Sequence, residues 1–432
     1  MTLASSNNFP TYRHRAIWIA LSLLSGVGTL IATGCGSAPT SGGTSPSSSQ
    51  IVIQPMTTVN ASSATGYFQD PYPIHTLASA TTPDLPTFSG TTKQLLSCSG
   101  SLQPDCFTGT AVTLDSAAFA IQVQNAGSSL VTFEGLNIYQ DSTGTWQMAA
   151  TAVLKNPKFK NPWNVIVHCH PTTVPAAGIP TAWTEDTLLI GSLNTFDYDD
   201  YDAKYFEDSG KLYLTYNKQL VIGQDAVVAQ GMASATATDG TATITLLGPE
   251  TANGGYNSEY SEGLNPSSNV KLIETGNIRK IQGKYVMTYS DGAFNRPDYK
   301  CGIAWSDTFL PAAGTYYTRV QKTDTAGVWG QPGHAEVQYL LQSQISQWPN
   351  YVESQVLAPG VPAIITDASG NYYLSFAGYD PSDAPTDSSG LYMGTHRRPY
   401  YIKLQVQIPA GSTVSGTTPQ DLVNWIQPAT AS

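Results

Sequence analysis

The sequence predicts an all-β fold, a five-bladed β-propeller, from two observations. The first is that short β-rich runs recur between clusters of Gly, Asn, Asp and Pro, and little of the chain looks helical. Many short strands with frequent turn signals are typical of a sandwich, barrel or propeller. The clearest runs are residues 118–124, 212–216, 242–247 and 285–289. The second observation, an internal repeat, favours the propeller among these three folds.

The repeat is a tight turn followed by a strand of alternating residues. It reads SGKLYLTY at 209–216, QGKYVMTY at 282–289 and SGNYYLSF at 369–376, with a fainter copy, TGTWQM, at 143–148. Each copy has the pattern of the second half of a β-hairpin. The glycines fall at positions 144, 210, 283 and 370, a spacing that suits blades with long loops. One further blade fits before residue 144, which makes five.

The predicted propeller spans residues 51–410. A strand near residues 51–54 is expected to help close the last blade. Residues 411–432 are predicted to form a C-terminal tail. We expect a monomer.

Residues 1–35 have the pattern of a bacterial lipoprotein signal peptide. A basic start at 13–15 precedes a mainly apolar run at 16–31, and small residues come directly before Cys35. We predict that Cys35 becomes a lipidated first residue, so that the chain is exported and membrane-anchored, facing the periplasm or the cell exterior. An ordinary signal peptide or a membrane anchor is the alternative. Residues 36–50 are almost entirely Ser, Gly, Thr, Pro and Ala, which predicts a flexible tether.

Four cysteines remain besides Cys35. Cys98 and Cys106 bracket a short loop and could pair in an oxidising compartment. Cys169 and Cys301 could pair or stay free, which the sequence leaves open. The absence of any CxxC pair argues against a structural zinc site.

The charge excludes one class of partner. The net charge is −11 and only 12% of residues are charged. A nucleic-acid-binding protein needs a basic footprint, which this composition does not provide. The same balance argues against an acidic polysaccharide as the main substrate.

Three carboxylates stand near the start of predicted blades. Asp70 opens the first unit, Asp202 is 8 residues before Gly210, and Glu274 is 9 before Gly283. Innermost strands of a propeller line its central channel, so we expect these side chains to meet at one mouth of that channel. Glycoside hydrolysis needs a carboxylic acid to protonate the leaving oxygen and a carboxylate to activate water or attack the sugar. The alternative is that each acid only caps a strand end or turn.

On these segments the chain resembles the five-bladed propellers of glycoside hydrolase family 43, of the arabinanase, xylosidase and arabinofuranosidase type. The resemblance covers residues 66–405 and is strongest at 202–310. It implies that Asp70 is a general base that activates water, that Asp202 tunes and orients the acid, and that Glu274 is the general acid. It also implies inversion at the anomeric carbon and substrates such as arabinan and arabinoxylan.

The chain departs from the family at three places. The acid motif Glu-Gly-Pro is replaced by Glu-Thr-Gly at 274–276, and Glu262 is a rival for the acid. Asp70 lacks the usual Gly-Tyr-Tyr hairpin. The last-blade histidine that touches a central metal in many members is replaced by Gly-Val at 360–361, with His334 the nearest substitute. The rivals of Asp202 are Asp197, Asp199 and Asp200. No cofactor is required on this interpretation, and structural calcium or a water cluster is left open as the alternative.

Four other residues are candidates for substrate binding. They are His168, Phe294, Trp305 and Arg397. Aromatic rings stack on sugar rings but also fill propeller cores, so the core is the alternative for the tryptophan. Two other functions stay open: a non-catalytic propeller that binds surface glycans, and a related enzyme such as a fructan hydrolase or a glycoside phosphorylase.

Overall fold

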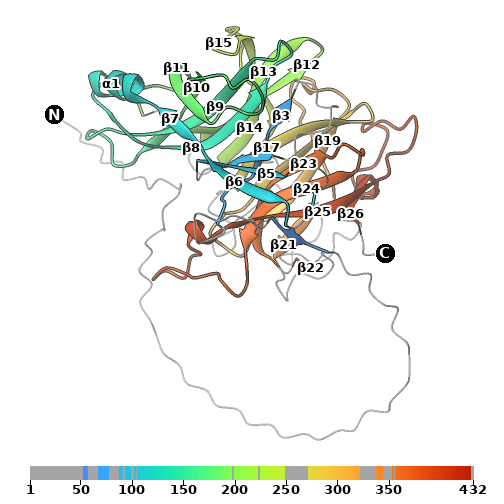
Figure 1. Ribbon diagram of the computed structural model, residues 1–432. Coiled ribbons are helices and arrows are strands. Elements are labelled where there is room, and N and C mark those ends of the chain that lie inside the picture. Colours follow the sequence, from blue (N-terminus) through green and yellow to red (C-terminus); the bar gives the residue numbers. More distant parts are fainter. Residues whose placement is uncertain are drawn as a thin grey trace, which may run out of the picture.

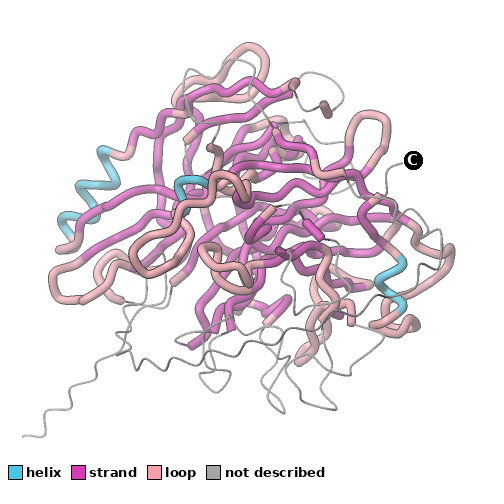
Figure 2. Tube along the Cα trace, turned by 90° about the horizontal axis from the view of Figure 1, so that it is seen from below, coloured by secondary structure: helices cyan, strands magenta, loops and turns pink. Residues whose placement is uncertain are grey.

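A computed structural model gives the structure of the protein (Figure 1). It describes residues 52–56, 67–76, 87–90, 93–98, 102–103, 105–196, 199–221, 224–248, 271–321, 337–343, 353–354 and 356–429. Strands dominate these residues, as Figure 2 shows from below. The signal-peptide, lipidation and tether predictions, and the residues Glu262, His334 and Asp197, lie outside the described residues. Among the described helices, none is long and apolar enough to cross a membrane.

The described strands form four hydrogen-bonded sheets. The largest sheet divides at the short parallel pairing of β14 with β17, which leaves five mainly antiparallel units that we call blades 1 to 5. Blade 1 holds β2 (Tyr72–Pro73), β4 (Thr87–Gly90), β5 (Gln94–Cys98) and β6 (Phe107–Ala111). Blade 2 holds β8 (Ser129–Gln140), β9 (Trp146–Lys155), β10 (Trp163–Pro171) and β11 (Ala182–Ile190), with β3 (His75–Thr76) and β7 (Thr113–Asp115) at its edges. Blade 3 holds β12 (Asp200–Asp208), β13 (Lys211–Val221), β14 (Gln224–Ser234), β15 (Ala237–Thr238) and β16 (Ile244–Leu247).

Blade 4 follows blade 3 through a short parallel pairing of β14 with β17. It holds β17 (Lys271–Ile281), β18 (Lys284–Asp291), β19 (Lys300–Ser306), β20 (Thr318–Arg319), β21 (Leu341–Ser343) and β22 (Glu353–Ser354). Blade 5 holds β23 (Leu357–Thr366), β24 (Tyr372–Tyr379), β25 (Arg398–Val406), β26 (Ile426–Pro428) and β1 (Gln54–Pro55). Five units are compatible with the five predicted blades.

The predicted hairpins are confirmed in blades 2 to 5. They join β8 to β9, β12 to β13, β17 to β18 and β23 to β24. Gly144, Gly210, Gly283 and Gly370 lie in these turns with φ of 84°, 78°, 80° and 80°. This left-handed conformation is strained for residues with a Cβ atom, which explains why glycine recurs there.

The first strand of blades 2 to 5, which we call the inner strand, also carries a bulge ahead of its hairpin turn. The strand register shifts next to Gly135, Asp202, Thr275 and Val361. All four have φ between 53° and 56°, and Asp70, just before β2, has φ 56°. A bulge re-aims side chains and is common beside active sites. By this geometry Asp202 matches Thr275, so Glu274 stands one residue earlier in its blade than Asp202 does in its own.

The expected strand at 118–124 is wrong, because these residues belong to the helix α1 (Ala117–Asn125). The segment is rich in Ala and Gln, which favour helix, and Phe119 and Val123 lie one turn apart on its buried face. The Asp115 side chain accepts a hydrogen bond from the backbone N–H of Ala117 at 3.1 Å. The helix packs against β8 and β11 at one side of the molecule (Figure 1).

The expected tail at 411–432 is also wrong for the part that the structure describes. A 3-10 helix (Asp421–Asn424) leads into β26, which pairs with β25. Trp425 is buried and meets the Trp305 ring edge-on at 5.1 Å. This segment therefore completes blade 5 and covers its core.

The closing strand is confirmed, because Gln54 and Pro55 of β1 pair with Tyr401 and Tyr400 of β25. The two ends of the described chain therefore meet in blade 5. Cys98 and Cys106 form a disulfide, whereas Cys169 and Cys301 are buried thiols.

Candidate active site

The bulged ends of the inner strands surround one pocket with a volume of about 280 Å³. This size is close to the lower end for small-ligand sites, which start near ~300 Å³. Asp70, Asp202 and Glu274 all line it, from blades 1, 3 and 4. Phe294 and Arg397, two of the predicted substrate-binding residues, line it as well. The structure thus brings five of the predicted residues together.

Asp70 is held by a cation. The Nη1 atom of Arg397 donates a hydrogen bond to Asp70 Oδ1 at 2.6 Å, and only 4% of the arginine side chain is exposed. The guanidinium also lies 5.3 Å above the centre of the Tyr299 ring. Burial works against the charge of Arg397, but Asp70 and the neighbouring groups outweigh it and raise its pKa. The arrangement places a buried positive charge against this carboxyl group and fixes its position.

Glu274 is held by two phenols. Tyr299 donates to Glu274 Oε1 at 2.8 Å, and the Tyr201 hydroxyl lies 3.1 Å from Oε2. Burial, with Glu274 as the next cause, raises the pKa of Tyr299 well above its usual value, so this hydroxyl keeps its proton. Tyr299 comes from the segment after β18, and its ring needs the space above Gly360. A Cβ atom at Gly360 would lie 1.8 Å from Tyr299 Cε1.

Asp202 is held at its backbone and its carboxylate. Its N–H donates to Thr151 Oγ1 at 3.0 Å, and Tyr72 donates to Asp202 Oδ1 at 3.1 Å. Burial raises the pKa of Tyr72 well above its usual value, with Asp202 and Asp70 adding to the shift. Gly135 of blade 2 leaves room for this carboxylate, since a Cβ atom there would lie 2.8 Å from Asp202 Oδ1.

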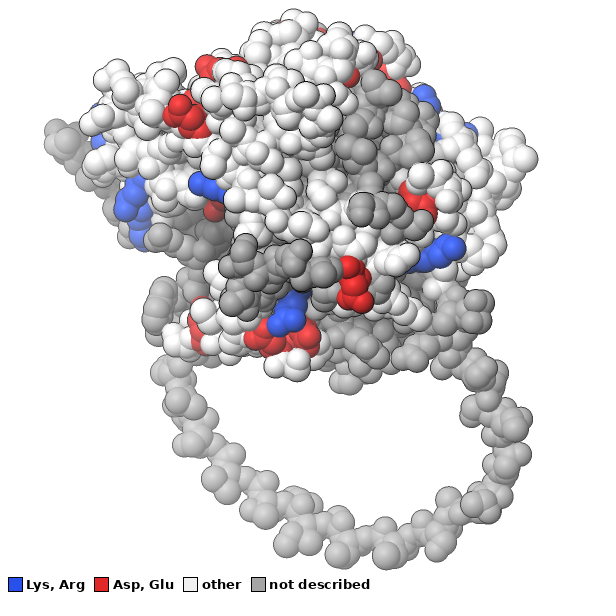
Figure 3. All heavy atoms as spheres, in the orientation of Figure 1, with Lys and Arg blue, Asp and Glu red and all other residues white. Residues whose placement is uncertain are grey.

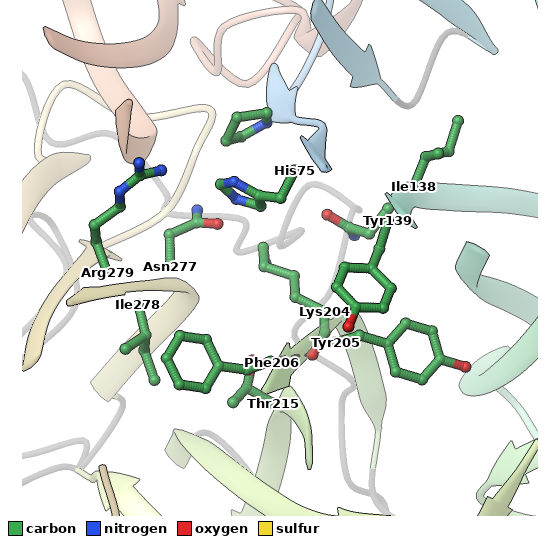
Figure 4. Close-up of a pocket in the computed structure, with 12 residues that line it drawn as sticks. His75, Ile138, Tyr139, Lys204, Tyr205, Phe206, Thr215, Asn277, Ile278 and Arg279 are labelled. Carbon is green, nitrogen blue, oxygen red and sulfur yellow. Dashed lines mark hydrogen bonds between the residues drawn. The ribbon is translucent and has the colours of Figure 1, made fainter. Parts of the chain in front are cut away.

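Lys204 is close enough to the three carboxylates to feel their charge. Its ammonium donates to the Asp202 carbonyl at 3.0 Å and sits 4.9 Å from the centre of the Tyr72 ring. Burial lowers the pKa of Lys204 to about 8, against the attraction of Asp202, Asp70 and Glu274. The same side chain lines a second pocket with His75, Asn277 and Arg279, which Figure 4 shows. Lys204 is therefore a buried cation that lines the second pocket and attracts the carboxylates of the first.

Two of the residues predicted to bind substrate, Trp305 and His168, lie outside the pocket. Trp305 lines neither pocket and is fully buried in a hydrophobic core with Trp425. His168 is also buried, and its Nδ1 and Nε2 atoms lie 2.6 Å from Asp186 and 2.8 Å from Gln147. Trp305 packs between blades 4 and 5, and His168 is held by two neighbours of its own blade. Neither of the rivals Asp199 and Asp200 lines the pocket.

Sequence reasoning missed four residues at the site. Glu134 lines the pocket in blade 2, ten residues before Gly144, so the repeat could have indicated it. Lys204 follows Asp202 by two residues, and strand alternation gives a signal for it. Tyr201 precedes a bulge and Tyr299 comes from a loop, so neither has a periodic signal.

Within the described part of the chain, no group of three His, Cys, Asp or Glu side chains is placed to hold a metal ion. Structural calcium stays a prediction. On the face shown in Figure 3 the charged side chains are scattered rather than gathered into a basic patch.

No family model matches the sequence, and no curated protein does. Solved structures do match. An α-L-arabinofuranosidase from Lactobacillus brevis superposes with a TM-score of 0.53 at 14% identity, over 79% of this chain and 91% of that one. A thermostable family-43 glycoside hydrolase superposes with a TM-score of 0.50 at 15% identity, over 81% of this chain and 96% of that one.

The chain has a family-43-type propeller fold. At these identities the likeness concerns the fold, and the predicted all-β propeller is confirmed by it. The pocket lies at the ends of the inner strands of this propeller, formed by residues far apart in the sequence.

Proposed function

We propose that this protein is a glycoside hydrolase that cleaves glycosidic bonds in pentose-containing polysaccharides or oligosaccharides with inversion. The observation that carries the proposal is the pair of environments in one pocket. Asp70 is bound to a guanidinium, and Glu274 is bound to neutral phenols. Inverting glycosidases need one carboxylate and one carboxylic acid on opposite sides of the sugar.

In this proposal each residue has one task. Ionised Asp70 takes a proton from a water molecule, and that water attacks the anomeric carbon. Glu274 gives its proton to the glycosidic oxygen as the bond from the anomeric carbon to that oxygen breaks. Asp202 adds negative charge beside the acid, which helps to keep Glu274 protonated until the reaction. Arg397 and Tyr72 hold the two aspartates in place.

The substrate class rests on the pocket and on the fold. Phe294 and tyrosine rings line the pocket, and such surfaces stack on sugar rings. The fold is shared with an α-L-arabinofuranosidase. The net charge of −11 favours neutral sugars over acidic ones. Arabinan- and xylan-type polysaccharides are neutral and consist of sugar rings that can stack on aromatic side chains.

The test is hydrolysis of arabinan, arabinoxylan, xylan oligosaccharides and aryl pentosides by the purified chain. We expect release of pentose. Proton NMR spectra recorded before the free sugar mutarotates should show that the configuration at its anomeric carbon is inverted. Glu274→Gln should reduce turnover of natural linkages by about 10³-fold or more while the fold is kept. Glu207→Gln on β12, outside the pocket, is the matched control and should stay active.

Two results would contradict the proposal. One is a folded wild-type protein that binds these sugars tightly and releases no product after long incubation. The other is normal turnover by Glu274→Gln. Turnover that depends on inorganic phosphate would instead indicate a phosphorylase.

A further inference from the structure

Blade 2 carries a glutamate at the same structural position as Glu274 of blade 4. Glu134 and Glu274 are each the last residue that pairs with the neighbouring strand before the bulge of their inner strand. Pairing resumes in both blades at an asparagine, Asn137 and Asn277 respectively. Each asparagine donates from Nδ2 to the carbonyl of its own bulge residue, at 2.9 Å in blade 2 and 3.2 Å in blade 4. The two blades therefore share one local structure, and both glutamates line the pocket.

The strand beside each glutamate supports the same equivalence. Glu134 pairs with Thr151 of β9, and Thr151 Oγ1 accepts a hydrogen bond from the backbone N–H of Asp202 in the next blade at 3.0 Å. The corresponding residue of blade 4 is Ser290, whose Oγ accepts a hydrogen bond from the backbone N–H of Val361 in blade 5 at 2.7 Å. The backbone around Glu134 is thus tied into the ring of blades, and a side chain on such a strand is placed more precisely than one on a loop.

No step of the proposed reaction uses Glu134. Its strand β8 contacts β2 of blade 1 on one side and β12 of blade 3 on the other, and contacts from β12 to β17, from β17 to β23 and from β23 to β2 complete the ring. Glu134 therefore lies between the blades of Asp70 and Asp202 and two blades away from Glu274. In the proposed reaction the leaving group is on the side of the acid Glu274. Glu134 consequently lies on the side of the sugar whose anomeric carbon reacts.

The pocket has an aromatic wall opposite Glu134. Phe294 of blade 4 packs against Gly394 of blade 5, where a Cβ atom would lie 2.8 Å from Phe294 Cε2. In a ring of five blades, blade 2 faces this junction of blades 4 and 5. On the blade 2 side the pocket is polar, because Thr151 and Asn164 line it together with Glu134. A sugar that packs its apolar face on Phe294 therefore has polar groups across the pocket for its hydroxyl groups.

A carboxylate is well suited to two adjacent hydroxyl groups. Its two oxygens only accept hydrogen bonds, and each can accept one from a hydroxyl group of the same diol. Such charge-assisted hydrogen bonds are stronger than those between neutral groups. We propose that Glu134 is a specificity-determining residue that binds adjacent hydroxyl groups of the sugar whose anomeric carbon reacts. The inference rests on the proposed function, because it names the group of that site that recognises the substrate.

The experiment compares substrates that differ by one hydroxyl group. Aryl α-L-arabinofuranosides and β-D-xylosides, and their analogues with a single hydroxyl group replaced by hydrogen, are given to the wild type and to Glu134→Gln. We expect kcat/KM of the variant to fall by roughly tenfold to a hundredfold on the complete sugars. The loss should shrink to within about twofold on the analogue that lacks a bound hydroxyl group, because the partner of Glu134 is then already absent. Glu207→Gln is the control and should match the wild type on every substrate.

A binding measurement separates this inference from the proposed function. The full chain with Glu274→Gln is titrated calorimetrically with arabinobiose and with xylobiose, with and without Glu134→Ala, and circular dichroism checks the fold of each variant. We expect Glu134→Ala to raise the Kd by about tenfold or more. An unchanged Kd together with an unchanged kcat/KM of Glu134→Gln would overturn the inference and leave the proposed function standing.

The leaving group supplies the remaining discrimination. A loss in Glu134→Gln that appears on natural linkages and disappears with an acidic phenol would mean that Glu134 acts as an acid, and this result would also overturn the inference. Absence of hydrolysis by a wild type that binds the two disaccharides would defeat the proposed function, and the calorimetric comparison would still decide the role of Glu134.

Discussion

Asp70 and Glu274 line the same pocket, yet the protein surrounds them differently. Asp70 in blade 1 meets the Arg397 guanidinium at 2.6 Å, whereas Glu274 in blade 4 meets two tyrosine hydroxyls at 2.8 and 3.1 Å. A cation favours the charged form of a carboxyl group, whereas neutral hydroxyls can serve either form. Two carboxyl groups whose surroundings push their proton affinities apart can act as a base and an acid.

The largest expected effect distinguishes the acid Glu274 from the base Asp70, because only loss of the acid should depend on the leaving group of the substrate. Glu274→Ala should reduce hydrolysis of a natural pentoside by roughly 10³-fold, because the leaving oxygen then departs without a proton. The leaving group of an aryl pentoside with an acidic phenol departs without needing a proton. The Glu274→Ala variant should therefore hydrolyse such a substrate at close to the wild-type rate. Asp70→Asn should lose activity on both substrates alike, because attack by water is impaired in each. Steady-state rates on matched substrates measure this, and an equal leaving-group dependence for both variants would reverse the assignment.

A smaller effect is expected from the arginine. Arg397→Met removes the hydrogen bond that positions the Asp70 carboxylate, so hydrolysis of natural and aryl pentosides should fall by roughly tenfold to a hundredfold. The loss should not depend on the leaving group, because Glu274 keeps its contact with Tyr299. Arg398→Met is the control, since that neighbour binds Asp383 rather than Asp70. Steady-state rates measure this, and a loss confined to natural linkages would contradict the pairing of Arg397 with the base.

The smallest effect concerns stability and comes from Glu185, a carboxyl group that has neither a guanidinium nor a phenol beside it among the described residues. It is buried on β11, and neither of its oxygens has a hydrogen-bond partner among the described residues. Burial, with a contribution from Asp186, raises its pKa from 4.5 to about 8. The folded chain therefore holds this proton more tightly than the unfolded chain, and stability from this group is lost as pH rises from 4.5 through 8.

Glu185→Gln mimics the neutral form at every pH. We expect the variant to gain about 2 kcal/mol in the free energy of unfolding over the wild type at pH 9, and little at pH 4. Urea denaturation at the two pH values measures it, with Glu207→Gln as the control for removal of a charge. A gain that is equal at both pH values would mean that Glu185 titrates normally.

The sequence was most informative where the fold repeats. The hairpin glycines predicted four blades directly, since each turn needs a left-handed residue. The same phase located Asp202 and Glu274 to within one residue of equivalent positions. It could not give the bulges that separate them by one position, because a bulge changes the register without changing the local pattern.

Other contacts depend on approaches between distant segments. Tyr299 reaches Glu274 only because Gly360 of the next blade has no side chain. Tryptophan side chains occur both in sugar-binding sites and in hydrophobic cores. The packing of Trp305 against Trp425 places both of them in the core.

The place where the two ends of the described chain meet, at the pairing of β1 with β25, has a consequence for synthesis of the protein. Asp70 and Arg397 are 327 residues apart in the chain, and β1 and β25 meet beside them. A ribosome delivers Asp70 early and its cation only near the end, after the strands that hold Glu274 have already emerged. The base is therefore completed last, at ring closure. A chain cut short before residue 397 lacks both the arginine that binds Asp70 and the strand that pairs with β1, so hydrolysis requires synthesis of the whole ring.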